Sequence, residues 1–234
     1  MEGKLYLIPS FLGTENANEV FPELNISIIR SLRHFIVEDE RTARRFIKRV
    51  VPEMVIDELS FKLLNEHTRD AEIGAYLEPC KEVSIGLLSD AGVPCIADPG
   101  SLIVKMAHAK GIDVIPLVGP SSIILALMAS GMNGQNFAFQ GYLPIAKPDR
   151  SKAIKTIEKR SQTENQTQLF IETPYRNVQL LEELVRTCSP QTQLCVACDL
   201  TLPEQYIKTY SIEQWRTKKP DIHKRPALFI LKLS

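Results

Sequence analysis

The sequence predicts an α/β fold with two domains, and three observations support this prediction. Short β-rich runs alternate with helical stretches through the first half of the chain, a pattern that favours a parallel sheet. The turn Gly119-Pro120-Ser121-Ser122 then opens an apolar helix and is a candidate hinge. The chain of 234 residues, 44% of them hydrophobic, is long enough for two small domains. We therefore expect an N-terminal domain over residues 1–118, mainly a parallel sheet, and a mixed α/β domain over 119–234.

The first half of the chain supplies the elements of an open sheet covered by helices. Gly111 is expected to end the last helix of this half. The patterns predict strands at 5–8, 35–37, near 59–64, at 83–88 and at 112–117, and helices around 25–32 and at 40–50, 69–78 and 102–110.

The second half begins with an apolar helix at 123–130. Serines at its start are placed to cap its backbone N–H groups, and Gly131 is placed to stop it. After it we expect strands at 137–139, 169–172, around Leu194, near 205–210 and at 227–233, helices near 151–160 and at 175–186, a loop over 141–149 and a polar connector over 161–168.

The formal net charge of the chain is zero, which excludes a protein that attracts its partner through its net charge. Lys plus Arg and Asp plus Glu both total 28, so RNA, a membrane surface or an acidic ligand must be bound by a local patch. The apolar run at 5–8 stops at Pro9 and is too short for a secretory signal or a membrane span. We expect a cytoplasmic protein that does not bind membranes.

The five cysteines do not form the pattern of a disulfide framework, because their number is odd and they are scattered through the chain. Cys195-x-x-Cys198 has the spacing of half a redox or metal site. It lies in an apolar run that is typical of a buried strand, and no second Cys/His pair accompanies it. We expect reduced thiols and no metal.

The segment from Ser89 to Gly100 is the main candidate for a ligand loop. It follows an apolar strand, and ligands of open parallel sheets bind where the strands end. Ala91 and Gly92 allow close approach to the backbone, while Pro94 and Pro99 hold the loop and offer no N–H donor. Such a loop suits an adenosyl group that carries a sulfonium charge. The alternative is a structural loop in which Asp98 caps the next helix. The dinucleotide, phosphate-loop and zinc-protease motifs are absent from the sequence.

This segment, followed by Gly119-Pro120-Ser121, resembles the tetrapyrrole methylase superfamily, the class III S-adenosylmethionine-dependent methyltransferases. Within it the chain most resembles the small-subunit ribosomal RNA cytidine 2′-O-methyltransferase branch. The supporting pieces, in order along the chain, are Leu5-Tyr6-Leu7-Ile8, Glu38-Asp39-Glu40-Arg41-Thr42, Asn65-Glu66-His67, Gly141-Tyr142-Leu143-Pro144, Glu172-Thr173-Pro174-Tyr175-Arg176 and Asp199-Leu200-Thr201. The resemblance implies two α/β domains with S-adenosylmethionine in the cleft between them, and a homodimer.

The resemblance also implies which residues contact the cofactor, mostly through backbone or apolar groups. They are Pro9 after the first strand, Ala91, Gly92, Val93 and Ile96 in the loop, Ser121 and Ser122 at the capped helix, and Ile171, Glu172, Ala197, Asp199 and Leu200 in the second domain.

The chain departs from the branch at three places that bear on substrate. Where the branch has Thr-Pro-Ile-Gly-Asn after the first strand, this chain has Ser10-Phe11-Leu12-Gly13-Thr14. The acidic-Asp-Thr-Arg pattern of the branch becomes Glu38-Asp39-Glu40-Arg41, and Tyr175 replaces a histidine. We also expect two domains without the extra C-terminal module that ribosomal RNA members often add.

Methyl transfer to a ribose hydroxyl requires orientation of the acceptor and a group that accepts its proton. The candidates for these catalytic roles are Glu38, Asp39, Glu66, His67 and Arg176. Each of three candidates also has a structural alternative. Asp39 would cap the following helix, His67 would be a surface residue, and Arg176 would form an ion pair with Glu172. For Asp90 and Asp98 the structural alternative is that their carboxylates fix the loop by accepting hydrogen bonds from its backbone amides.

Two locally basic stretches are candidates for contact with RNA phosphates. The residues are Arg41, Arg44, Arg45, Lys48 and Arg49 on one helix, and Lys147, Arg150, Lys152, Lys155, Lys159 and Arg160 on another. Solvated helix faces are the alternative for both, and Tyr142 is the best-placed aromatic residue for stacking on a base. The sequence therefore predicts an S-adenosylmethionine-dependent RNA methyltransferase. A methyltransferase of a small tetrapyrrole-like metabolite and a non-catalytic S-adenosylmethionine-binding protein are the alternatives.

Overall fold

The structure is a computed structural model that describes residues 3–13, 16–64, 68 and 70–233, without the side chains of residues 70 and 71. The chain forms two compact units, 1–121 and 122–234, whereas the boundary predicted from the sequence follows Val118. Each unit is a sheet covered by helices, so the predicted α/β class with two domains is confirmed.

Unit 1 contains a five-stranded sheet in the order β3-β2-β4-β1-β5. All of its pairings are parallel. The strands are β1 (Leu5–Ile8), β2 (His34–Val37), β3 (Ser60–Leu63), β4 (Ile85–Leu88) and β5 (Val114–Pro116). Because they run the same way, their carboxyl ends meet at one edge of the sheet, where the loops that follow them gather.

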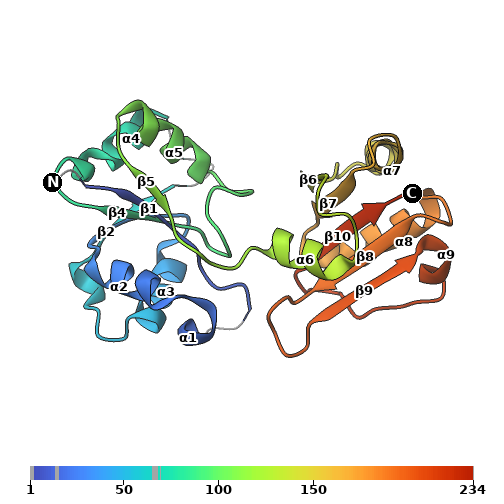
Figure 1. Ribbon diagram of the computed structural model, residues 1–234, viewed down its shortest axis with the longest axis horizontal. Coiled ribbons are helices and arrows are strands. Elements are labelled where there is room, and N and C mark those ends of the chain that lie inside the picture. The colour runs from blue at the N-terminus through green and yellow to red at the C-terminus, as the bar shows by residue number, and fades with distance from the viewer. Residues whose placement is uncertain (1–2, 14–15, 65–67, 69, 234) are drawn as a thin grey trace. The chain divides into compact units, whose positions relative to one another are not determined.

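Helices cover both faces of the unit 1 sheet, as Figure 1 shows. They are α1 (Ala17–Val20), α2 (Glu23–Ser31), α3 (Glu40–Val50), α4 (Asp70–Tyr76) and α5 (Gly100–Ala109), with short 3₁₀ turns at Ile56–Glu58 and Glu78–Lys81. Phe35 and Val37 pack with α2 and α3, whereas Ile36 packs with α4 and α5. This alternation follows from the two-residue repeat of a strand, which sends successive side chains to opposite faces.

Helix α3 shows why the sequence predicted its bounds correctly. Its buried residues Ala43, Phe46, Ile47 and Val50 recur at the spacing of one helix face. The Asp39 side chain accepts a hydrogen bond of 2.7 Å from the Thr42 amide and so caps the first turn. The charged residues of α3 are thereby left on its outer side.

Unit 2 contains a mixed five-stranded sheet in the order β6-β7-β10-β8-β9. Only the β6–β7 pairing among these is parallel. The elements are α6 (Ser122–Ser130), β6 (Phe137–Tyr142), α7 (Lys147–Thr163), β7 (Thr167–Ile171), a 3₁₀ turn (Pro174–Arg176), α8 (Asn177–Thr187), β8 (Gln193–Cys198), β9 (Tyr206–Ser211), α9 (Ile212–Trp215) and β10 (Ala227–Lys232).

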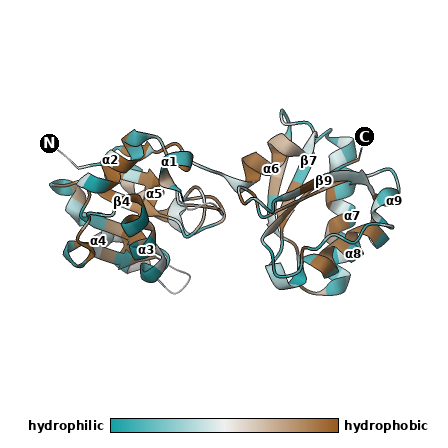
Figure 2. Cartoon of the chain, turned by 90° about the horizontal axis from the view of Figure 1, so that it is seen from below, coloured by the Kyte–Doolittle hydropathy of each residue, from teal (hydrophilic) through white to brown (hydrophobic). Residues whose placement is uncertain are grey.

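The two faces of the unit 2 sheet are covered by different helices. Phe170 packs with α7, α8 and α9, while its neighbour Leu169 packs with α6 on the other face. Figure 2 shows the apolar residues of both units in the sheets and on the inner sides of the helices. The apolar Cys195–Cys198 run is part of β8 and is buried, as the strand prediction required.

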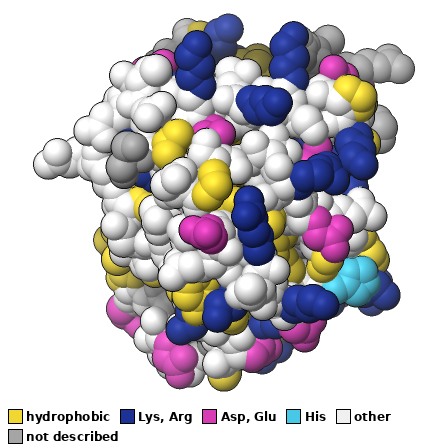
Figure 3. Space-filling model, turned by 90° about the vertical axis from the view of Figure 1, so that its right-hand side faces the viewer, with side chains coloured by type: hydrophobic (Ala, Val, Ile, Leu, Met, Phe, Trp, Pro, Cys, Tyr) yellow, Lys and Arg dark blue, Asp and Glu magenta, His cyan; other side chains and the backbone are white. Residues whose placement is uncertain are grey.

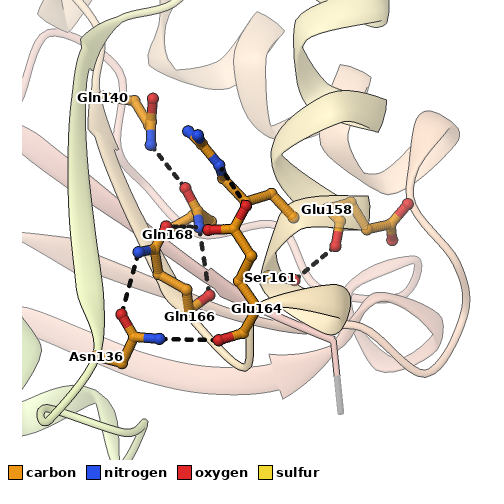
Figure 4. Close-up of polar contacts among 8 residues, drawn as sticks. Asn136, Gln140, Glu158, Ser161, Glu164, Gln166 and Gln168 are labelled. Atoms are coloured by element: carbon orange, nitrogen blue, oxygen red, sulfur yellow. Dashed lines mark hydrogen bonds and ion pairs between the residues drawn. The ribbon is translucent and has the colours of Figure 1, made fainter.

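A network of side-chain amides joins β6 to β7 near the end of α7 (Figure 4). Gln140 donates to Gln168, at 2.7 Å, and Gln168 donates to Gln166, at 2.9 Å. Gln166 in turn donates to Asn136, at 3.1 Å, whose own amide donates to the Glu164 carbonyl at 2.8 Å. These polar groups satisfy one another beside an edge strand of the sheet.

Several element bounds predicted from the sequence are wrong. The predicted loop at 141–149 is strand up to Tyr142, because a register shift with Gly141 at φ +65° lets the chain continue along β7. Helix α7 begins at Lys147 and ends at Thr163, beyond the predicted 151–160 on both sides, with Pro148 in its first turn. The four-residue helices α1 and α9 were not predicted.

Among the described residues, no helix has the length and apolar character needed to span a membrane.

Candidate functional site

The loop from Ser89 to Gly100 follows β4 at the carboxyl edge of the unit 1 sheet. Glu38, which follows the neighbouring strand β2, accepts hydrogen bonds from the Ser89 hydroxyl and the Asp90 amide, both at 3.0 Å. The structure thus brings one predicted catalytic residue, Glu38, against the predicted cofactor loop. These two hydrogen bonds hold the start of that loop to the adjacent strand.

Three residues of this loop have left-handed backbone conformations. Gly92 has φ +72°, Cys95 +70° and Ala97 +65°. The conformation costs glycine little, but it is strained for residues with a side chain. Asp98 holds the strained turn, because its carboxylate accepts hydrogen bonds from the Cys95 amide at 2.9 Å and the Gly100 amide at 2.7 Å. This agrees with the alternative in which Asp98 fixes the loop.

The ends of β1 and β5 lie next to this loop. The Ser10 amide donates to the Gly92 carbonyl at 2.9 Å. Gly119 packs so closely on Pro9 that an added Cβ would lie 2.2 Å from the proline Cγ. A Cβ on Gly92 would lie 3.2 Å from the Pro120 carbonyl oxygen. The structure therefore gathers Pro9, Gly92 and the turn before α6, which the resemblance assigns to the cofactor.

The loop presents small or apolar groups to solvent. Ala91 is exposed, Val93 is half-buried, and the Ile96 side chain is 51% exposed. Ile96 therefore adds apolar surface to the exposed side of the loop.

Asp39 and Asp90 lie beside Glu38 but differ in their electrostatics. Hydrogen bonding from Thr42 lowers the pKa of the Asp39 carboxyl, as expected for a helix cap. Partial burial, with the nearby charges of Glu38 and Asp39, raises the pKa of the Asp90 carboxyl. Asp90 is therefore the better proton acceptor of the two. Glu66 and His67, the other predicted catalytic pair of this unit, lie outside the described residues.

A pocket of about 620 Å³ opens beside the loop in unit 1. Its wall is formed by residues 10–13 after β1, by side chains of α3, by Pro52, and by Asp90 and Ala91 of the loop. The three segments are far apart in the sequence. The sheet order brings them together, because β4 lies between β2 and β1.

In unit 2, the predicted cofactor contacts between residues 171 and 200 lie at the carboxyl ends of β7 and β8. Leu228 of β10 is paired with Ile171 on one side and with Ala197 on the other. Ile171, Ala197 and Leu200 all belong to the apolar cluster that packs under α6. Asp199 and Thr201 have φ +49° and +73°, so this stretch also contains strained residues.

Glu172 and Arg176 form an ion pair across the turn that follows β7. The Arg176 Nη2 lies 2.6 Å from Glu172 Oε1, which also accepts from the Thr173 amide at 2.7 Å. The second oxygen, Oε2, is buried and has no hydrogen-bond partner among the described residues. Asp199 is paired in the same way with Arg225, at 2.5 Å. Arg225 was missed in the sequence, because nothing in the spacing from Asp199 signals the pair.

The two basic stretches differ in how many charges they leave for a ligand. On α3, Arg44 is paired with Glu40 and Asp57, while Arg45 forms no ion pair with a described residue. On α7, Arg150 is buried against Glu183, and Arg160 is paired with Glu164. Lys152, Lys155 and Lys159 remain exposed on α7. On the face of the molecule drawn in Figure 3, Lys and Arg are interspersed with Asp and Glu rather than gathered in one field.

The described residues contain no group of three or more His, Cys, Asp or Glu side chains that would hold a metal ion. Burial raises the pKa values of Cys80, Cys95 and Cys198, each to about 11.

Solved structures of low sequence identity share the fold. Diphthine synthase has a TM-score of 0.66 and 13% identity over 97% of this chain and 89% of its own. The methyltransferase CobJ has a TM-score of 0.62 and 15% identity over 99% of this chain and 95% of its own. The uroporphyrin-III C-methyl transferase of Thermus thermophilus, solved with S-adenyl homocysteine, has a TM-score of 0.52 and 16% identity over 98% and 97%. At these identities the likeness shows the fold that the chain shares with these proteins.

No protein-family model matches the chain, but curated relatives do. It is 33% identical to ribosomal RNA small subunit methyltransferase I of Xylella fastidiosa, over 85% of this chain and 69% of that protein. The protein of the same name from Thermotoga maritima is 28% identical, over 93% of this chain and 94% of its own length.

The chain spans about two thirds of the length of two further relatives of that name, 66% for Escherichia coli O157:H7 and 65% for Vibrio cholerae. The identity to the E. coli protein is 30%, over 86% of this chain. These relationships cover both units, and the chain belongs to the ribosomal RNA small subunit methyltransferase I family.

Proposed function

We propose that this protein is an S-adenosylmethionine-dependent methyltransferase that acts on small-subunit ribosomal RNA, at a ribose 2′-hydroxyl. The observation that carries the proposal is the Ser89–Gly100 loop, strained at Cys95 and Ala97 and held by Glu38 and Asp98 at the carboxyl edge of a parallel sheet. Backbone strain of this kind is retained where the surrounding structure enforces it for function. The names of the relatives, ribosomal RNA small subunit methyltransferase I, support ribosomal RNA as the substrate.

The residues present fit S-adenosylmethionine on two observations. The loop has small side chains around Gly92, with the exposed Ile96 as an apolar surface. In unit 2, the buried Glu172 Oε2 lacks a partner among the described residues, and a hydroxyl or amino group of a nucleoside would satisfy it. The proposal therefore keeps the predicted contacts, which are Pro9, Ala91, Gly92, Val93, Ile96, Ser121, Ser122, Ile171, Glu172, Ala197, Asp199 and Leu200.

S-adenosylmethionine, when bound, supplies a methyl group activated by a sulfonium. The protein has to orient the acceptor and accept its proton, and orientation alone is worth on the order of 7–11 kcal/mol in favourable cases. Glu38 fixes the loop by accepting the hydrogen bond of the Asp90 amide. In this proposal the Asp90 carboxylate, which lines the pocket and has a raised pKa, accepts a hydrogen bond from the acceptor hydroxyl. Asp39 supports the site by capping α3, and Arg176 holds the Glu172 carboxylate. Glu66 and His67 stay in the proposal as substrate-orienting residues.

The proposal includes a cytoplasmic homodimer, as the family resemblance implies. Light scattering of the purified protein at several concentrations measures its mass and tests this part.

Calorimetry with S-adenosylmethionine, paired with transfer of labelled methyl into total RNA and into small metabolites, tests the function. We expect binding, and label in RNA. Label in metabolites only would favour a small-molecule methyltransferase, and binding without transfer would favour a non-catalytic binding protein. Failure to bind either S-adenosylmethionine or its demethylated product would overturn the proposal.

A further inference from the structure

The pocket of about 620 Å³ beside the loop has cationic, acidic and apolar groups in its wall. Arg45, Lys48 and Arg49 of α3 supply positive charge, and Asp90 is the acidic residue among the described residues that line it. Phe11 and Phe46 supply aromatic surface, with ring centroids 5.3 Å apart. The volume is in the range of ligand pockets in proteins.

Two cations of this wall, Arg45 and Lys48, are available to an anion. Arg45 is exposed and forms no ion pair with a described residue, in contrast to Arg44, which is paired with Glu40 at 2.8 Å. Lys48 donates to the Met54 carbonyl at 3.1 Å, which uses one of the three N–H groups of its ammonium. An anion in the pocket would therefore meet a guanidinium and an ammonium from successive positions on one helix face.

Ser10 provides a second and independent sign of a ligand. It lines the pocket and is 3% exposed, yet its hydroxyl has no hydrogen-bond partner in the described part of the chain. Buried polar groups in native proteins are nearly always hydrogen-bonded, because leaving one unpaired costs stability. A ligand oxygen in the pocket would satisfy this hydroxyl.

A simple inorganic anion does not explain the whole wall, because Asp90 would repel it. A ribonucleotide carries a phosphate for the cations, a hydroxyl that donates to a carboxylate, and a base that stacks on aromatic rings. Phe11 is half-buried, so part of its ring is open to such a contact. The three kinds of group in the wall match the three parts of one nucleotide.

We propose that this pocket binds the acceptor nucleotide of the RNA, with its phosphate at Arg45, Lys48 and Ser10, its ribose hydroxyl at Asp90 and its base at Phe11. The proposal rests on the proposed function and adds where the substrate is bound. It also gives a role to Ser10-Phe11-Leu12-Gly13, the segment that departs from the rest of the branch.

Binding of a labelled single-stranded oligoribonucleotide and of its deoxy counterpart, followed by fluorescence anisotropy, tests the pocket. The variants are Arg45→Gln/Lys48→Gln, Asp90→Asn and Ser10→Ala. Lys105→Gln is the matched control, because Lys105 is exposed on α5, which packs on the other face of the sheet. Calorimetry with S-adenosylmethionine is run on every variant.

We expect the double variant to bind both oligonucleotides at least tenfold more weakly and with a flatter salt dependence, because phosphate contacts are lost. Asp90→Asn keeps affinity for the deoxy strand and loses the preference for ribose. Ser10→Ala weakens RNA binding severalfold but leaves the thermal unfolding midpoint unchanged or raised, an outcome that a merely structural serine would not give. Lys105→Gln and S-adenosylmethionine binding stay unchanged.

The proposal for the pocket would be overturned if the double variant and the unchanged protein bound RNA with equal affinity. It would also be overturned if the unchanged protein did not bind RNA. If that protein still methylates RNA while the double variant binds RNA normally, the pocket proposal fails and the proposed function stands. If the pocket variants lose RNA binding but no methyl transfer is found, the proposed function fails and the nucleotide pocket stands.

Discussion

Single residues set the backbone path of the loop that follows β4. The sequence indicated Gly92 as a point of close approach. It is left-handed, and a Cβ added to it would lie 3.1 Å from Leu12 Cδ2 and 3.2 Å from the Pro120 carbonyl oxygen. Cys95 and Ala97 are left-handed too, and no sequence pattern indicates this, because both residues ordinarily avoid the conformation. Their geometry depends on Asp98, whose carboxylate binds amides on both sides of the turn.

Gly92→Ala is expected to destabilise the protein and to weaken S-adenosylmethionine binding by about tenfold, which corresponds to about 1.4 kcal/mol. The left-handed conformation costs alanine about 1–2 kcal/mol. In addition, the new Cβ would lie 3.1 Å from Leu12 Cδ2 and 3.2 Å from the Pro120 carbonyl oxygen. Calorimetry measures the affinity, and thermal unfolding followed by circular dichroism measures the stability.

Gly111→Ala is the control for this prediction. Gly111 has φ +70°, but nothing lies within 4 Å of an added Cβ. It should lose stability from the backbone alone and bind S-adenosylmethionine normally. Equal loss of affinity in the two variants would show that the close approach at Gly92 has no part in binding.

The Cys95 thiol is expected to react slowly at neutral pH. Burial, with the nearby Asp98 carboxylate, raises its pKa to about 11. Only the thiolate is nucleophilic, so the rate of alkylation by iodoacetamide should climb about tenfold per pH unit from pH 7 to 9.5. Mass spectrometry of the peptide that contains Cys95 measures this rate. A rate that levels off near pH 8.5, as for the same residue in urea, would contradict the raised pKa.

At the scale of elements, a buried ion pair joins α7 to α8. Arg150 lies 2.6 Å from Glu183, and both side chains are buried. The sequence grouped Arg150 with the lysines of α7 as a candidate phosphate contact. Its partner Glu183 lies on another helix, and no spacing in the sequence indicates such a pair.

Arg150→Met is expected to cost about 3–5 kcal/mol of the free energy of unfolding, because it leaves the Glu183 carboxylate buried without its cation. Trp215 is the one tryptophan of the chain and is buried in unit 2, so urea unfolding followed by its fluorescence reports on this unit. Arg160→Met removes the exposed pair with Glu164 and should cost about 1 kcal/mol or less. Equal effects of the two substitutions would show that burial does not decide the contribution of Arg150.

Element bounds were predictable where one periodic pattern dominates. Helix α3 was predicted exactly, because its apolar spacing and its Asp39 cap agree. The strand predicted at 137–139 was shorter than β6, because a glycine such as Gly141 usually indicates a turn. In the structure Gly141 lies within the strand, where the pairing with β7 is irregular. Helices of four residues, such as α1, are too short to produce a periodic signal.

At the scale of the whole molecule, the sequence predicted the two α/β units and the loop edge of the first sheet. The pocket beside that edge could not be predicted, because its walls come from segments after β1, after β2 and after β4. They become neighbours only through the order β2-β4-β1, which the chain order does not specify. The sequence singled out Arg45 and Lys48 together as part of a basic stretch, but it did not connect them with Asp90. Ser10 was noted only as part of a divergent loop, and its unpaired hydroxyl is a property of the fold.

The central claim is that the protein transfers a methyl group from S-adenosylmethionine to a ribose hydroxyl of small-subunit ribosomal RNA. The most direct test is incubation of the purified protein with labelled S-adenosylmethionine and small ribosomal subunits from a strain that lacks the enzyme. Nuclease digestion and mass spectrometry of the nucleosides then locate the label. The account predicts a labelled 2′-O-methyl nucleoside, which is lost with Asp90→Asn. Label on a base, or in no nucleoside of that RNA, would contradict it.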